Sequence, residues 1–123
     1  MSKRVLDVGN CNRDHGAIRA LIETNFDAQV VRAHTGRDAA TELQQGAFHL
    51  VLVNRLLDRD GSDGLEVIRQ VKSCSDTAGT PCMLISNYAE YQELARQAGA
   101  EPGFGKAELS LAQTVEKLRP FLG

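Results

Sequence analysis

Short apolar runs alternate with amphipathic stretches along the whole chain. Four of these runs have the length of β-strands: Val5–Val8, Ala28–Ala33, Leu50–Val53 and Cys82–Ile85. The last two are apolar at every position, which is typical of strands whose sheet is covered by helices on both faces. A weaker fifth strand, Pro102–Gly105, contains Pro and Gly residues that suit the edge of a sheet. The pattern therefore predicts a central parallel sheet.

Stretches with helical periodicity lie between and after these strands. Their expected ranges are Asn12 or Asp14 to Asn25, Arg37–Gln45, Asp63–Lys72, Asn87–Ala98 and a last helix from Ser110 onward. Asp63 and Glu66 have the spacing of a helix-capping box. Ser110 and Gln113 repeat this spacing. Strands that alternate with helices predict an α/β fold, here a doubly wound five-stranded parallel sheet with helices on both faces and a crevice at the carboxyl ends of its strands.

Length and charge narrow the range of partners. At 123 residues the chain is expected to fold as one domain, 1–123. Its formal net charge is −2 and its basic residues are scattered among acids, which argues against nucleic acid or an anionic membrane surface and favours a protein partner. No apolar run approaches the ~18 residues of a spanning helix. Three cysteines without metal-ligand spacing suit a reducing compartment, so we expect a cytoplasmic protein.

Several segments follow one another in the order of the strands and helices of one known family. They are KRVLDVGN, VVRAHTGRDAA, FHLVLVN with SDGLEVIRQVK, TPCMLIS and AGAEPGFGK. Together they resemble the response-regulator receiver domain over nearly the whole chain. The resemblance implies a flavodoxin-like fold with strand order 2-1-3-4-5 and a role in two-component signalling. Because fold does not carry function, the chemistry is sought position by position.

The resemblance places the phospho-acceptor aspartate of the family at Asn54, and the family's metal-binding acid pair at Gly9 and Asn10. An amide oxygen is a poor nucleophile with no anionic form. Hard divalent cations such as the family's Mg²⁺ need anionic oxygen ligands. Ser86 and Lys106 match the hydroxyl and the lysine of the family pocket. The resemblance therefore implies a degenerate receiver that is not an enzyme and holds no metal or cofactor.

The retained polar residues also have purely structural interpretations. Lys106 is expected to hydrogen-bond the Asn54 amide or a carbonyl, and Ser86 to be a satisfied hydroxyl or the cap of the next helix. Asp7 occupies an apolar position of the first strand, where an unpaired carboxylate is costly. We expect it to pair with an Arg or Lys; the alternative is an acid relocated into the pocket.

Two loops at the expected pocket differ in length from the family pattern. The segment from Asn54 to Gly64 is longer, and the segment from Ser86 to Gly99 is shorter. Loops on a rigid scaffold commonly carry binding residues. The shorter segment contains Tyr88 and Tyr91, which are candidate anchors for a partner because aromatic residues are frequent at interface hot spots.

Three functional hypotheses follow. The first is a phosphorylation-independent, receiver-like interaction module of a bacterial two-component system, whose partner is a kinase, an output protein or a second copy of the chain. The second is a receiver with a displaced acceptor, Asp58 or Asp60. The third is a flavodoxin-like small-molecule module, because GNCNRDHG follows the first strand where such folds bind phosphate or a cofactor. The acidic loop at Asp58, Asp60 and Asp63 lacks the Gly and Glu positions of a calcium loop.

Overall fold

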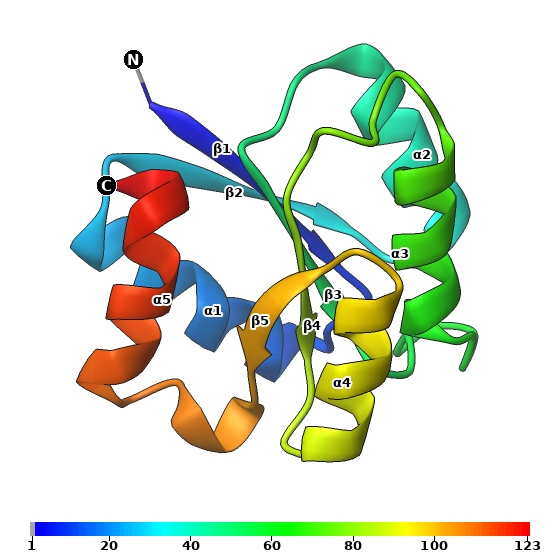
Figure 1. Ribbon diagram of the computed structural model, residues 1–123. Helices are drawn as coiled ribbons and strands as arrows, with labels where there is room; N and C mark the ends of the chain where they lie inside the picture. The colour runs from blue at the N-terminus through cyan, green and yellow to red at the C-terminus, as the bar shows by residue number, and fades with distance from the viewer. Residues whose placement is uncertain (1) are drawn as a thin grey trace.

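The computed structural model describes residues 2–123, and its centre is one parallel five-stranded sheet. The strands are β1 (Lys3–Val8), β2 (Ala28–Ala33), β3 (Leu50–Asn54), β4 (Cys82–Ile85) and β5 (Glu101–Phe104). Their order in the sheet is β2-β1-β3-β4-β5 (Figure 1). The predicted fold class and strand order are confirmed.

Helices cover both faces of the sheet. They are α1 (Asn12–Asn25), α2 (Gly36–Gln45), α3 (Gly64–Ser73), α4 (Ala89–Gln97) and α5 (Ala112–Leu122), with a short 3-10 turn η1 (Lys106–Glu108) before α5. In Figure 1, α1 and α5 lie on one side of the sheet, and α2, α3 and α4 lie on the other. None of the helices in this part of the chain is long and apolar enough to cross a membrane.

The all-apolar strands supply two separate cores. In β3, Val51 and Val53 face the core under α3, where they belong to one cluster with Ile68. Leu50 and Leu52 face the opposite core under α1 and α5. Successive side chains of a strand point to opposite faces, so each of the four residues Leu50–Val53 meets one of the two cores. This explains why the β3 sequence shows no alternation.

The start of the last helix differs from the prediction. The predicted capping box at Ser110 does not form, and α5 begins two residues later, at Ala112, after Leu111 in the cap position. The segment before it is held by another contact, because the Thr114 hydroxyl donates to the Glu108 carbonyl at 2.6 Å. The prediction was wrong because Ser110 lies in the turn that follows η1, and spacing alone cannot distinguish a residue of such a turn from a helix cap.

The other helix starts agree more closely with the sequence. Asp63 caps α3, since its carboxylate accepts a hydrogen bond from the Leu65 amide at 2.9 Å. Glu66 does not complete a capping box but lies 3.4 Å from Arg69 on the helix surface. Helix α4 is shorter than the predicted Asn87–Ala98, and its Leu94 is 41% exposed.

Candidate functional site

The candidate site lies at the carboxyl edge of the sheet. Asn54 ends β3, Ser86 directly follows β4, and Lys106 lies just after β5. The carboxyl ends of parallel strands meet at one edge of the sheet, so these three residues are brought together although they are far apart in sequence. They line one pocket of about 340 Å³. We call it the Asn54 pocket; its lining is Asn54, Arg55, Leu56, Ile85, Ser86, Asn87, Tyr88, Tyr91 and Lys106.

Asn54 acts as a hydrogen-bond donor to the main chain. Its side-chain Nδ2 donates to the carbonyl oxygen of Gly9 at 3.0 Å, and the residue is only 9% exposed. The same carbonyl accepts the backbone amide of Asp58 at 2.8 Å. One oxygen atom thus joins the end of β1, the end of β3 and the loop after β3. A carboxylate at position 54 could not make this contact, because an ionised carboxyl group only accepts hydrogen bonds.

Gly9 is closely covered by the loop after β3. Its backbone has φ +77°, and a Cβ placed on it would lie 2.3 Å from Cδ2 of Leu57 and 3.0 Å from the Cα of Leu57. Leu57 is fully buried in the core under α3. In this conformation no larger residue fits at position 9, including the acid that the family resemblance would place there. The role of Leu57 was missed by the sequence analysis, because an apolar loop residue carries no local sign of what it covers.

The loop from Arg55 to Asp63 is folded against itself. The Leu57 amide donates to the Ser62 carbonyl at 2.9 Å, and the Gly61 amide donates to the Leu57 carbonyl at 2.8 Å. Leu56 and Asp63 form an isolated antiparallel bridge. The segment that the sequence identifies as longer than the family pattern is therefore a compact turn.

Asp7 and Asn10 form a buried polar pair beside the pocket. The Asp7 side chain is fully buried, Nδ2 of Asn10 donates to its Oδ1, and Nδ1 of His15 lies 2.7 Å from its Oδ2. Burial raises the pKa of Asp7, and the hydrogen bonds from His15 and Asn10 oppose this effect. The expected Arg or Lys partner of Asp7 was wrong, because α1 presents His15 to the strand. Asp7 does not line the Asn54 pocket, so an acid relocated into the pocket is not observed.

Arg32 on β2 closes the same network from the neighbouring strand. It pairs in register with Asp7, and its positive charge also acts to lower the pKa of that carboxyl. Its guanidinium donates to Oδ1 of Asn12 at 2.7 Å and to the Asn10 carbonyl at 3.0 Å. The network therefore fixes the connection from β1 to α1.

Lys106 is directed to α1 rather than to Asn54. Its Nζ lies 2.7 Å from Oδ2 of Asp14, and this hydrogen bond lowers the pKa of the Asp14 carboxyl. The expected hydrogen bond to the Asn54 amide or to a carbonyl was wrong. An ammonium gains more from a carboxylate than from a neutral amide, and α1 places one within reach.

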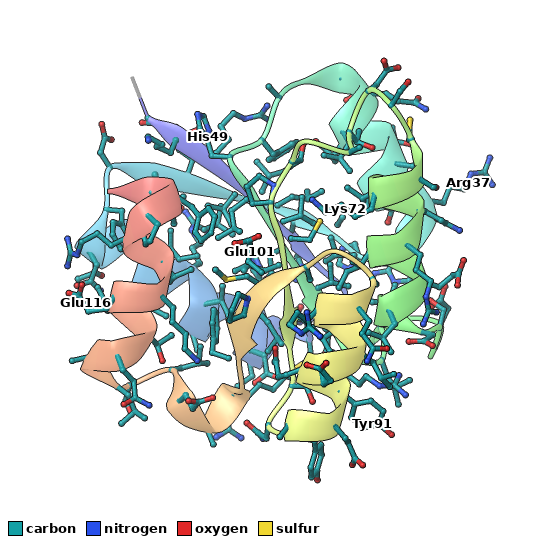
Figure 2. The ribbon with its side chains drawn as sticks, in the orientation of Figure 1. Arg37, His49, Lys72, Tyr91, Glu101 and Glu116 are labelled. Atoms are coloured by element: carbon teal, nitrogen blue, oxygen red, sulfur yellow. The ribbon has the colours of Figure 1, made fainter. Side chains whose placement is uncertain are left out.

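Ser86 has the structural role expected of it. Its Oγ accepts the backbone amide of Tyr88 at 3.2 Å, at the start of α4. Tyr88 is 62% exposed, and the centroid of its ring lies 6.2 Å from that of Tyr91 in an edge-to-face arrangement. The Arg55 guanidinium covers the Tyr91 ring at 4.1 Å from its centroid. Figure 2 shows the Tyr91 side chain beside α4. Tyr88 is therefore the more exposed of the two aromatic residues, and the Tyr91 ring packs between it and Arg55.

Gln92 joins β4, β5 and α4 around Gly103. Its Nε2 donates to the carbonyls of Leu84 at 2.9 Å and Ser86 at 3.1 Å, and its Oε1 accepts the Gly103 amide at 3.1 Å. A Cβ at Gly103 would lie 2.2 Å from the Leu84 carbonyl oxygen. The fold therefore has no room for a side chain at this position. No sequence signal identified Gln92, since a glutamine on a helix surface usually faces water.

The residues at this edge do not fit the divalent cation of the family. Gly9 has no side chain, Asn10 is bound to Asp7, and Asn54 points a donor at a carbonyl. Across residues 2–123, no three His, Cys, Asp or Glu side chains are grouped so that they could hold a metal ion.

Comparisons of the whole chain show likeness in structure without likeness in sequence. No protein-family model matches the chain. No curated protein matches it in sequence. A chemotaxis response regulator of Vibrio cholerae matches with TM-score 0.80 and 18% identity, over 99% of this chain and 100% of that one. A response regulator of Thermotoga maritima matches with TM-score 0.77 and 22% identity, over 96% and 98%.

A third solved structure is relevant to the chemistry of the site. It is a response regulator of Burkholderia pseudomallei with a phosphorylated aspartic acid, a calcium ion and citrate. It matches with TM-score 0.74 and 18% identity, over 99% of this chain and 67% of that one. At these identities the matches establish that the chain has the fold of response-regulator receiver domains, and leave its chemistry to be argued from its own residues.

Proposed function

We propose that this chain is a receiver-like module of two-component signalling that binds a protein partner without being phosphorylated. The observation that carries the proposal is the Gly9 carbonyl, which accepts both Nδ2 of Asn54 and the amide of Asp58. Position 54, where the resemblance places the phosphorylated aspartate, thus holds an amide whose hydrogen bond to Gly9 is part of the fold. A nucleophilic carboxylate there would lose this contact.

The surroundings of Asn54 support the same proposal. The phosphorylated neighbour from Burkholderia pseudomallei was solved with a calcium ion. In this chain the fold covers Gly9 with Leu57 and engages Asn10 with Asp7, so neither position offers an anionic ligand. Lys106 is bound to Asp14. We propose that the module carries out no phosphoryl transfer and serves as a cytoplasmic binding surface for a kinase or an output protein.

Acetyl phosphate tests this proposal. The purified chain is incubated with acetyl phosphate and Mg²⁺, and its mass is measured intact under conditions that preserve acyl phosphates. We expect no mass increase, because no carboxylate occupies the carboxyl end of β3.

A gain of one phosphoryl group would contradict the proposal and favour the displaced acceptor. Asp60 is exposed in the loop, where hydrogen bonds from Ser62 hold its carboxylate and lower its pKa. The double variant Asp58→Asn with Asp60→Asn then decides. Loss of the added mass in this variant would assign phosphorylation to the loop.

A further inference from the structure

We infer that the Asn54 pocket receives an acidic side chain of the protein partner, while an adjacent aromatic side chain of the partner lies between Leu56 and Tyr88. The inference rests on the proposed function and names the chemistry of the partner. Its observations are the exposed apolar walls of the pocket, the charge of its lining and the hydrogen-bond donors in its interior.

The two walls are exposed apolar residues from different loops. Leu56 follows β3 and is 55% exposed, and Tyr88 precedes α4 and is 62% exposed. Both line the Asn54 pocket. They are the two most exposed large apolar side chains among residues 2–123. An apolar group of a partner that packed against both residues would shield from water the apolar surface that the fold leaves exposed.

The charged side chains that line the pocket are both basic, although the chain as a whole has a negative net charge. The lining contains Arg55 and Lys106 and no Asp or Glu. The whole chain has 14 basic and 16 acidic residues, so this excess of positive charge is local. Asp63 and Asp14, which pair with these two cations, do not line the pocket. Each cation is therefore already paired outside the pocket, and an anionic group of a partner would meet only basic charged side chains there, in competition with these two acids.

The pocket also has donors suited to a carboxylate. A lysine ammonium has three N–H donors, and the Lys106 side chain is 36% exposed, so it can bind a second carboxylate beside Asp14. The Ser86 Oγ accepts the Tyr88 amide, which leaves its own proton free to donate. The arrangement offers a carboxylate one charged and one neutral donor.

The size of the pocket fits side chains rather than a large cofactor. Its volume of about 340 Å³ is near the lower end of the ~300–1,000 Å³ range of small-ligand pockets. The carboxyl ends of β4 and β5 are held by Gln92, so the pocket is formed before the partner arrives. Preorganisation lowers the cost of binding.

The test uses the whole chain and a blocked dipeptide as probe. Acetyl-Glu-Phe-amide is titrated into the isotope-labelled protein, and the backbone amide signals of Ser86, Tyr88 and Lys106 are followed by NMR. We expect saturable shifts at these positions, with acetyl-Gln-Phe-amide bound about fivefold more weakly because it lacks the charge.

Variants separate the charge from the apolar walls. Asp14→Asn releases Lys106 from its partner and should tighten binding of the Glu dipeptide by roughly two- to threefold. Lys106→Gln should reduce the preference for Glu over Gln, because Arg55 is then the only basic residue left in the lining. Leu56→Ser should weaken both dipeptides, whereas Leu111→Ser, at a residue that is also exposed but does not line this pocket, should leave both unchanged.

Three results would overturn the inference: equal affinity for the two dipeptides, shifts confined to other surfaces, or tighter binding of free phenylacetate than of the dipeptide. The last result would assign the pocket to a small aromatic acid. A chain that takes up no phosphoryl group from acetyl phosphate and also fails to bind the dipeptide would refute only this inference. A chain that becomes phosphorylated would refute the proposed function itself.

Discussion

Replacing Asn54 by the aspartate of the family should destabilise this protein. In Asn54→Asp, Nδ2 is replaced by an oxygen that faces the Gly9 carbonyl, previously 3.0 Å from the amide nitrogen. The hydrogen bond is lost and an ionised carboxylate is left in a site that is 9% exposed. A lost hydrogen bond with a desolvated group left behind costs on the order of 1–3 kcal/mol.

Two features of the site keep this loss near the middle of the range. The Gly9 carbonyl retains the Asp58 amide, so it is not left without a donor. Lys106 lines the same pocket, so its remaining N–H donors can offset part of the new negative charge while it stays bound to Asp14. We therefore expect a loss of about 2 kcal/mol at neutral pH. For a chain of this length the midpoint of thermal unfolding should fall by roughly 5–10 °C.

The assay is urea unfolding of both proteins, with Asn12→Asp as the matched control. Oδ1 of Asn12 accepts a hydrogen bond from Arg32 at 2.7 Å, and an aspartate at position 12 would still accept it. Asn12 is also the first residue of α1, where negative charge is favourable. The control should change stability by less than about 0.5 kcal/mol. Acidification should reduce the loss in Asn54→Asp, because a protonated carboxyl group can donate to the Gly9 carbonyl. The reasoning is refuted if Asn54→Asp is as stable as the parent chain at neutral pH.

Three further predictions concern the surroundings of the pocket. Gly9→Ala should lower the free energy of unfolding in urea by about 2 kcal/mol or more, because Gly9 is in close contact with Leu57 and has φ +77°. Gly16→Ala has open space around its Cβ and should instead stabilise α1 by about 0.5–1 kcal/mol. Equal effects of the two substitutions would contradict the packing around Gly9. The folded-state pKa of Asp7 is raised above 3.8, so the contribution of Asp7 to folding stability is present below that pH and is lost as the pH rises. The parent chain should therefore lose stability relative to Asp7→Asn above about pH 4. A stability difference that does not change with pH would exclude this linkage. A thiol reagent should modify the exposed Cys74 rapidly and the buried Cys82, whose pKa is raised to about 11, only on unfolding; comparable rates in the folded protein would count against the burial of that strand.

The sequence predicted the scaffold well because burial of the sheet on two faces determines its strands directly. Every residue of Leu50–Val53 is buried, as the unbroken apolar run indicated. The β2 and β4 ranges were predicted without error. The alternation with helices predicted the doubly wound parallel sheet, and the family resemblance supplied its strand order.

The contacts of the site were predicted less well, because they depend on which long-range partner competes best. Lys106 binds Asp14 and Asp7 binds His15, and neither pair is marked by spacing in the chain. Leu57 and Gln92 have decisive positions in the structure, yet each is ordinary for its residue type. Local patterns identified where the pocket lies, and three-dimensional packing decided what its residues do.

The three hydrogen bonds of Gln92 bear on how a signal could pass through this module. The Gln92 side chain ties α4 to the ends of β4 and β5. A movement of α4 away from these two strands would therefore have to break all three hydrogen bonds. A binding surface held in this way is available from the moment the chain has folded. In the function proposed here, occupancy of the partner is therefore set by the amount of this protein in the cell, and control of its synthesis and degradation takes the place of a chemical switch.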